Sequence, residues 1–287
     1  MSDTYSHSSI ETNGIHLHVV TAGDPHGRPV SLLHGFPEFW YGWRHQIPAL
    51  VSAGFFVIAP DQRGYDLSDK PKEMRAYRLK ELVEDIRGLS GHFGFERAAV
   101  VGHDWGAAVA WELAIHHPEQ VEHLGILNVP HPAVMWEFLH KSIKQLLKSW
   151  YIGFFQIPVV PVSLLRFNRC AALAHMLKAS GRSGTFSQAE INEYKNAWRQ
   201  PGAIPAMIDW YRAAFNDRSS MAETHRNRVP TLILWGKKDV ALSEEMAVRS
   251  IAYCDHGELI YFENSSHWVQ HDEAEAVNRE LVAFLKS

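Results

Sequence analysis

The segment that most constrains the fold is the pentapeptide GHDWG at residues 102–106, with Asp104 at its centre. It follows the apolar run 98–101 and precedes a helix-like segment at 107–116. A strand, a glycine-flanked turn and a helix in this order predict a sharp turn at the end of a buried strand. The glycines permit such a turn, because residues without a Cβ tolerate strained dihedral angles. The central side chain would then stand above the sheet, with the N-terminus of the helix pointing at it.

Asp104 has two interpretations. An aspartate in front of a helix is most often an N-cap, whose carboxylate accepts a backbone N–H. Alternatively the turn is a nucleophile elbow, in which the residue between the glycines, usually a serine, attacks the substrate. Backbone N–H groups and the helix dipole would keep Asp104 ionised. An ionised carboxylate can attack an alkyl carbon and form an ester, and features further along the chain favour this second interpretation.

Apolar strand-like runs alternate with helical patterns at both ends of the chain, which predicts an α/β fold with a mostly parallel sheet and helices on both faces. Residues 15–21 also alternate, and we expect an edge strand there, followed by a hairpin turn at 22–29. Between 131 and 229 helical patterns continue without strands and are interrupted by prolines. We therefore expect a core domain formed by 1–130 and 230–287, and a helical cap or lid domain at 131–229.

The composition is that of a globular protein: of 287 residues, 46% are hydrophobic and 21% are charged. A net charge of −4 without a long basic run predicts no nucleic-acid or membrane partner. The N-terminus has no signal-peptide-like apolar segment, and two cysteines form no disulfide framework, so we expect a cytoplasmic protein. A His-x-His pair at 16 and 18 has no carboxylate or cysteine cluster beside it in the sequence, so we expect no metal. Monomer and homodimer both remain open.

Two residues further along the chain complete a candidate catalytic triad. In folds with this elbow, an acid and then a histidine follow the nucleophile. Asp239 comes just after the strand-like run 230–236, and His267 comes just after the run 258–262. Both would lie at carboxyl ends of strands, where open α/β sheets place their sites. His267 could activate a water molecule, with Asp239 fixing its tautomer and stabilising the imidazolium.

An oxyanion hole is expected beside the elbow. The segment HGFP at 34–37 follows the strand-like run 30–33, at the position from which such folds supply a second N–H donor. The hole would consist of the N–H groups of Phe36 and Trp105. Because the turn is tight, we also predict a cis peptide bond between Phe36 and Pro37.

These motifs together resemble one family. HGFPEFW at 34–40, DQRGY at 61–65, the GHDWG pentapeptide, Asp239 and His267 are similar to the α/β-hydrolase-fold epoxide hydrolases over nearly the whole chain. The resemblance implies an eight-stranded sheet, an inserted cap and no cofactor. It also implies that Asp104 opens an epoxide to an ester, which water then hydrolyses to a vicinal diol.

The resemblance further implies two cap tyrosines that donate to the epoxide oxygen, and Tyr151 and Tyr211 match their motifs. A phenol suits this step, because it stays protonated at neutral pH. An isolated buried tyrosine more often serves packing, so the assignment depends on the motif. The substrate pocket is expected to be apolar. It would include the following residues of the core and the cap: Phe36, Pro37, Trp40, Trp105 and Phe155.

Two alternatives share many of these features. Haloalkane dehalogenases resemble the chain closely and use the same aspartate nucleophile, but their halide needs donors such as an indole N–H and often an Asn after the His-Gly, where this chain has Phe36. A chain of this fold could also be a binding protein without turnover. The intact triad and the paired tyrosines favour an epoxide hydrolase over both.

Overall fold

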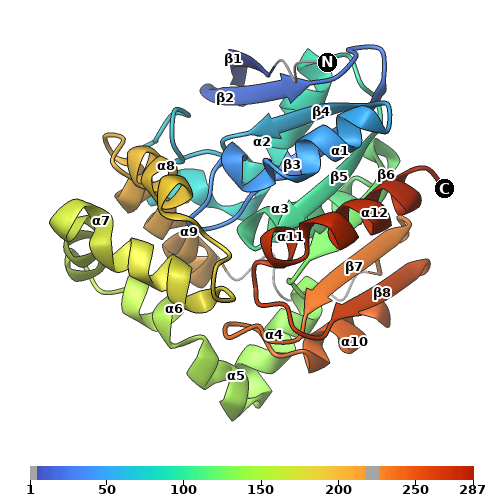
Figure 1. The fold of residues 1–287 in the computed structure, drawn as a ribbon. Helices are drawn as coiled ribbons and strands as arrows, with labels where there is room; N and C mark the ends of the chain where they lie inside the picture. The colour runs from blue at the N-terminus through green and yellow to red at the C-terminus, as the bar shows by residue number, and fades with distance from the viewer. Residues whose placement is uncertain (1–4, 218–225) are drawn as a thin grey trace.

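The computed structural model describes residues 5–217 and 226–287 and shows one eight-stranded sheet in the order β1-β2-β4-β3-β5-β6-β7-β8 (Figure 1). The strands are β1 (Ser6–Thr12), β2 (Ile15–Ala22), β3 (Arg28–Leu33), β4 (Phe55–Pro60), β5 (Ala98–His103), β6 (Val121–Leu127), β7 (Thr231–Gly236) and β8 (Gly257–Phe262). β2 pairs antiparallel with β1 and with β4, and the other neighbouring strands are parallel. The prediction of a mostly parallel eight-stranded sheet is therefore confirmed.

Helices cover both faces of the sheet, as expected for strands that are apolar on both sides. In β4, Phe55, Val57 and Ala59 belong to one core cluster, whereas Phe56 and Ile58 belong to the other, because successive side chains point to opposite faces. The first cluster is covered by α1 (Gln46–Ser52) and α12 (Ala274–Leu285). The second is covered by α2 (Leu79–His92), α3 (Trp105–His116) and α10 (Glu245–Ile251), and the short α11 (Val269–Asp272) precedes α12.

The start of the chain differs from its prediction in two ways. The edge strand is β1, whose first four residues are polar and exposed, so the sequence carried no apolar signal for it. The segment 15–21 is part of β2, which lies between β1 and β4. The turn at 22–29 is not a hairpin, because β3 pairs with β4 and β5 rather than with β2.

Between β6 and β7 the described residues form six helices, which, apart from α4, gather at the left and bottom of Figure 1. They are α4 (Pro132–Lys141), α5 (Ile143–Lys148), α6 (Trp150–Phe155), α7 (Val160–Ser180), α8 (Gln188–Trp198) and α9 (Ala203–Asn216). α7 contains a kink at 167–170, where the backbone leaves the helical region. Among the described residues, none of the helices combines the length and the apolar character required to cross a membrane.

The sheet topology determines where a site can form. From β3 the chain continues to β4 on one side, and β5 lies on the other side of β3, so the strand order reverses at the β3–β5 pair. Open α/β sheets bind ligands in the crevice outside the carboxyl ends of the strands at such a point. The segments that leave these two ends carry Phe36 and Asp104, and they are joined by a hydrogen bond.

Candidate active site

Asp104 occupies the turn between β5 and α3 with φ 49° and ψ −126°. Its side chain makes no capping hydrogen bond to α3, so the N-cap interpretation is wrong. A non-glycine residue at such a φ costs about 1–3 kcal/mol, which the surrounding structure must offset. The flanking positions require glycine because other backbone atoms lie too close for a side chain. A Cβ on Gly102 would lie 2.6 Å from the Cα of Ala107, and one on Gly106 would collide with the carbonyl of Leu33.

Backbone N–H groups hold the Asp104 carboxylate. The amide of Phe36 donates to Oδ1 at 2.7 Å, and the neighbouring amide of Trp105 favours the ionised form of the carboxylate. The Phe36–Pro37 peptide bond is cis, as predicted. Burial alone would raise the pKa of Asp104, but its hydrogen bond with His267 and the nearby histidine charge bring the pKa below its usual value. The carboxylate is therefore ionised and oriented.

The structure brings Asp239 and His267 together with Asp104. Nδ1 of His267 is 2.7 Å from Oδ2 of Asp239, and Nε2 is 3.5 Å from Oδ2 of Asp104. Asp239 follows β7, and His267 lies in the loop between β8 and α11. The imidazole thus bridges the two carboxylates, which is the arrangement of a nucleophile, a base and an orienting acid.

Asp239 is buried and fully hydrogen-bonded. Its Oδ1 accepts the amides of Ala241 at 2.7 Å and Leu242 at 2.9 Å, and its Oδ2 accepts Nδ2 of Asn128 at 2.8 Å. Burial opposes ionisation, but the charge of His267 and these donors hold the pKa of Asp239 below its usual value. The sequence analysis did not find this hydrogen bond between Asn128 and Asp239.

The two carboxylates change the acidity of His267. Burial would lower its pKa, but the charge of Asp239 and the hydrogen bonds to Asp104 and Asp239 raise the pKa from 6.5 to about 10. The imidazole of the resting protein is therefore protonated at neutral pH. If Asp104 lost its charge, one of the two anions that favour the imidazolium would be gone, and the pKa would fall.

A cavity of about 330 Å³ lies between the elbow and the inserted helices. Asp104, His267 and Pro37 of the core line one part of the cavity, and the tyrosines Tyr151 and Tyr211 of the inserted helices also line it. The remaining lining residues are mostly apolar: Phe36, Leu147, Lys148, Trp150, Phe155, Met176, Leu177, Ser180, Val240, Ala241 and Trp268. Asp239 lies behind this wall, whereas Asp104 and His267 face the space.

Aromatic contacts fix the position of Tyr211. Its ring centroid lies 4.9 Å from that of Phe155, 5.1 Å from that of Trp105 and 5.4 Å from that of Phe36. The ring of Tyr151 lies 5.9 Å from it at an interplanar angle of 82°. Burial, followed by the charge of Asp104, raises the pKa of both phenols above the usual value, so both hydroxyls remain protonated donors.

Several known proteins are similar to this chain along nearly its whole length. The family model described as "alpha/beta hydrolase fold" matches residues 28–274. The AB hydrolase superfamily protein YfhM of Bacillus subtilis is 46% identical over 279 residues, which are 97% of this chain and 97% of that protein. Epoxide hydrolase 4 of Mus musculus is 37% identical over 99% of this chain and 80% of its own length. The crystal structure of epoxide hydrolase A from Mycobacterium thermoresistibile has a TM-score of 0.85 at 30% identity and covers 99% of both chains.

The chain belongs to the epoxide hydrolase family of the α/β-hydrolase fold. The family match spans the elbow, the inserted helices, Asp239 and His267, so it is not limited to the sheet. It agrees with the resemblance inferred from the sequence motifs alone.

Within this epoxide hydrolase fold, two predicted substrate contacts lie elsewhere. Trp40 does not line the cavity, because the 3-10 turn that begins with it directs its ring against Tyr5 and His7. The ring of Trp105 packs on Trp210 and Tyr211 behind the lining, and only its amide approaches the carboxylate. The predicted contacts Phe36, Pro37 and Phe155 do line the cavity.

A buried network supports the histidine loop of this family member. Nε2 of His103 lies 2.9 Å from the backbone carbonyl of His267. Glu38, which is almost fully buried, accepts the hydroxyl of Tyr194 at 2.5 Å and is 2.8 Å from Nε2 of His271. Burial opposes its ionisation, yet the charges of the neighbouring histidines hold the pKa of Glu38 well below its usual value. In the sequence Glu38 is visible only as part of the HGFPEFW motif at 34–40, and no local pattern indicates this network.

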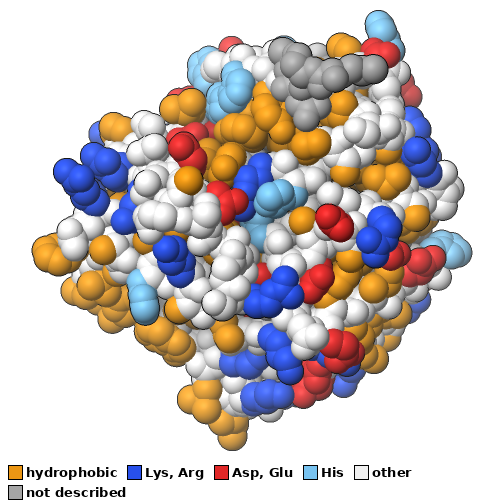
Figure 2. Space-filling model, viewed as in Figure 1, with side chains coloured by type: hydrophobic (Ala, Val, Ile, Leu, Met, Phe, Trp, Pro, Cys, Tyr) orange, Lys and Arg blue, Asp and Glu red, His pale blue; other side chains and the backbone are white. Residues whose placement is uncertain are grey.

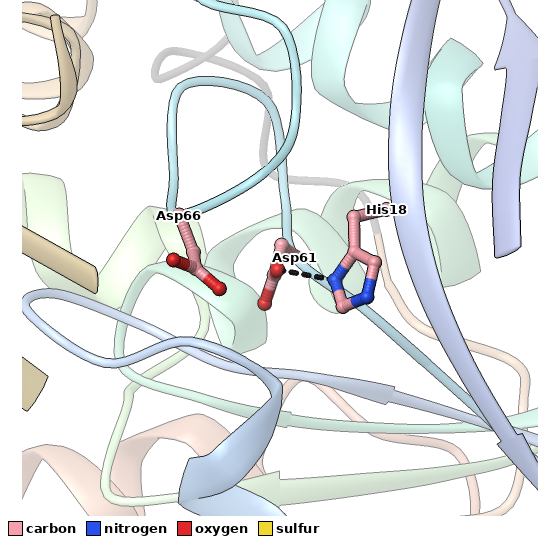
Figure 3. Close-up of side chains that lie close together, drawn as sticks. All are labelled: His18, Asp61 and Asp66. Atoms are coloured by element: carbon pink, nitrogen blue, oxygen red, sulfur yellow. Dashed lines mark hydrogen bonds and ion pairs between the residues drawn. The ribbon is translucent and has the colours of Figure 1, made fainter. Parts of the chain in front are cut away.

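One further cluster could be considered for a metal ion. His18, Asp61 and Asp66 offer ligand atoms within 4.8 Å of one another, and Asp61 lies between the other two (Figure 3). The carboxylates come from a distant loop, so the sequence neighbourhood of His18 did not reveal them. However, Nδ1 of His18 is 2.6 Å from Oδ2 of Asp61, and the amide of Trp40 donates to Oδ1 at 2.9 Å. These ligand atoms already have hydrogen-bond partners within the protein, and we assign no metal to this cluster.

Proposed function

We propose that the protein hydrolyses organic epoxides to vicinal diols through a covalent ester on Asp104. The observation that carries the proposal is the composition of one cavity wall. The nucleophile, the histidine and the two phenols face the same space of about 330 Å³. An epoxide held there would have a carboxylate beside its carbon and hydroxyl donors beside its oxygen, which is what ring opening requires.

In the first step Asp104 attacks an epoxide carbon. The Phe36 amide binds Oδ1, which leaves Oδ2 as the attacking atom. The C–O bond of the ring breaks as the ester bond forms, and the electron pair moves to the ring oxygen. Tyr151 and Tyr211 donate hydrogen bonds to that oxygen and supply its proton, which solvent later returns to the phenol. Raised pKa values keep both phenols in the donating form before the reaction.

In the second step water attacks the carbonyl carbon of the ester. Alkylation removes the charge of Asp104, and the pKa of His267 then falls from about 10. The imidazole can therefore lose its proton and take one from water, while Asp239 stabilises the imidazolium. Oδ1 becomes the oxyanion, and the amides of Phe36 and Trp105 stabilise it. The tetrahedral intermediate collapses, the diol oxygen takes the proton from His267, and the acid form of Asp104 passes its proton to the imidazole, which restores the carboxylate and the imidazolium.

We also propose that residues 131–229 act as the cap of this site. Tyr151, Phe155 and Tyr211 come from α6 and α9, and they close the cavity over the elbow. The lining is mainly apolar and aromatic, so apolar epoxides fit it better than polar ones. No step requires a cofactor or a metal.

Dehalogenation of a haloalkane is the second candidate, because it uses the same nucleophile. It needs N–H donors aimed at the departing halide. The Trp105 ring packs against Trp210 and does not line the cavity, whereas the tyrosines do. A panel of epoxides tested beside a panel of chloro- and bromoalkanes separates the two activities, and turnover of the second panel alone would refute our proposal.

The ester mechanism is tested with ¹⁸O-labelled water. Asp104 should acquire label after repeated turnovers, because water attacks the carbonyl carbon rather than the substrate. Mass analysis of the proteolytic peptide that holds Asp104 measures the incorporation. An active enzyme whose Asp104 stays unlabelled would exclude the ester.

A further inference from the structure

Large apolar side chains are exposed on one part of the inserted helices. Of the fourteen large hydrophobic residues exposed in the described part of the chain, nine fall between 143 and 167. Ile143 is 78% exposed and Phe167 is 74% exposed, and Val159 and Val160 at the start of α7 are 72% and 53% exposed. In Figure 2 hydrophobic side chains gather along the lower left rim, where Figure 1 shows α5 to α7. Contiguous exposure of this kind indicates an interaction surface.

The same part of the chain is strongly basic. Residues 138–189 contain no Asp or Glu and seven Lys or Arg: Lys141, Lys144, Lys148, Arg166, Arg169, Lys178 and Arg182. The formal charge of this segment is +7, so the other residues together carry −11 to give the total of −4. Lys141, Lys144, Arg166 and Arg169 are exposed among the exposed apolar residues. Lys141 and Lys144 lie beside Glu137 and Glu245, so Arg166 and Arg169 contribute most to the basic character of this face. The net charge of the whole chain conceals this asymmetry.

We propose that the face formed by α5, the loop 156–159 and the first half of α7 docks on the surface of a bilayer that contains anionic phospholipids. Apolar side chains would enter the boundary between headgroups and acyl chains, and the basic side chains would contact anionic headgroups. A second copy of the chain fits this face less well, because a symmetric contact would bring two basic patches together. Docking of this kind requires no membrane-spanning helix.

The lining of the cavity reaches this face at Leu147 of α5, and two further exposed lining residues lie outside the face. Leu147, Trp150 and Val240 line the cavity and are also 70%, 67% and 55% exposed. An apolar epoxide dissolved in the bilayer could then enter the site without crossing water. This consequence for substrate delivery depends on the proposed function, whereas the docking itself does not.

Vesicle co-sedimentation tests the docking without any substrate. The full chain is mixed with vesicles of phosphatidylglycerol and phosphatidylcholine, or of phosphatidylcholine alone. We expect binding to the anionic vesicles, and weaker binding when salt shortens the Debye length from about 30 Å at 0.01 M to about 3 Å at 1 M. The double variant Arg166→Glu with Arg169→Glu should bind at least about tenfold more weakly, because each basic residue contributes about a kcal/mol near such a surface.

Matched variants distinguish the loss of this face from the general effect of adding negative charge elsewhere on the protein surface. Ile143→Asp with Phe167→Asp should reduce vesicle binding at least about tenfold, whereas Val248→Asp, at an exposed apolar position of α10, should not. Arg279→Glu, on the exposed side of α12, is the control for charge. None of these side chains lines the cavity, so turnover of a water-soluble epoxide should stay unchanged and shows that each variant is folded.

The proposal is overturned by either of two results. One is a wild-type protein that sediments with neither kind of vesicle or equally with both. The other is self-association in solution that the Ile143→Asp and Phe167→Asp substitutions abolish, which would make the face a contact between two copies. If epoxides are not turned over but anionic vesicles are bound, the proposed function fails and the docking stands.

Discussion

Replacing His267 by glutamine should trap the ester on Asp104. In the proposed sequence the alkylation step needs the carboxylate and the tyrosines, and only the hydrolysis step needs the imidazole. Loss of a general base slows a step by about 10²- to 10⁴-fold. At about 1.36 kcal/mol for each factor of ten, the barrier of ester hydrolysis rises by roughly 3–5 kcal/mol. The ester should therefore persist long enough to be weighed.

The structure also indicates that this variant folds. Removing His267 takes one partner from the buried Asp239, and an uncompensated buried charge would cost about 3–5 kcal/mol. Here Asp239 keeps the amides of Ala241 and Leu242 and the side chain of Asn128, all within 2.9 Å. Thermal unfolding should thus show a moderate loss of stability and an intact cooperative transition.

The assay is intact-protein mass spectrometry of His267→Gln after mixing with an excess of an apolar epoxide. We expect a mass increase equal to one substrate, located by proteolysis to Asp104. The double variant with Asp104→Asn is the control, because its amide does not form the ester and should show no adduct. A folded His267→Gln protein that turns over at the wild-type rate, or that remains unmodified, would refute the assigned order of steps.

Three further outcomes follow from the site. Tyr151→Phe combined with Tyr211→Phe should reduce ester formation by about 10²-fold or more while leaving substrate affinity largely intact, because the alkoxide loses its acid; a stopped-flow single-turnover rate equal to wild type would contradict this. Asn128→Ala should lower the free energy of unfolding by about 1–3 kcal/mol, because it removes donors and acceptors from buried groups, and should reduce the deesterification rate more than the alkylation rate. The raised pKa of His267 contributes to the free energy of unfolding, and this contribution is fully present below pH 6.5 and is lost as the pH rises towards 10. Chemical denaturation of the wild type between these pH values should therefore show a falling free energy of unfolding, and the His267→Gln variant should lack this part of the fall.

The sequence was sufficient for the features whose cause is local. The glycines of the 102–106 turn and the apolar period of the strands are properties of neighbouring residues, and they predicted the parallel sheet and the strand ends that Asp104, Asp239 and His267 follow. β1 was missed because its exposed edge carries no apolar pattern. The wrong hairpin at 22–29 arose because turn residues show where a chain bends and do not show which strand it joins.

Only the tertiary structure could decide what depends on distant contacts. Asn128 and Asp239 are 111 residues apart, and Glu38 and His271 are 233 apart, so no local pattern reports these bonds. Trp40 belongs to the same motif as Phe36, yet a single turn directs its ring away from the cavity.

The distribution of charge is a second property that the sequence determines only in part. The sequence gives a net charge of −4, from which we expected no membrane partner. Net charge is a total over the chain and does not show where the charged side chains lie on the folded surface. The folded helices leave Arg166 and Arg169 exposed among the exposed apolar side chains of 143–167. Sequence thus determined which chemical groups are available and in what order. Folding decided which of them meet, because electrostatic and packing energies depend on distance in space rather than on separation along the chain.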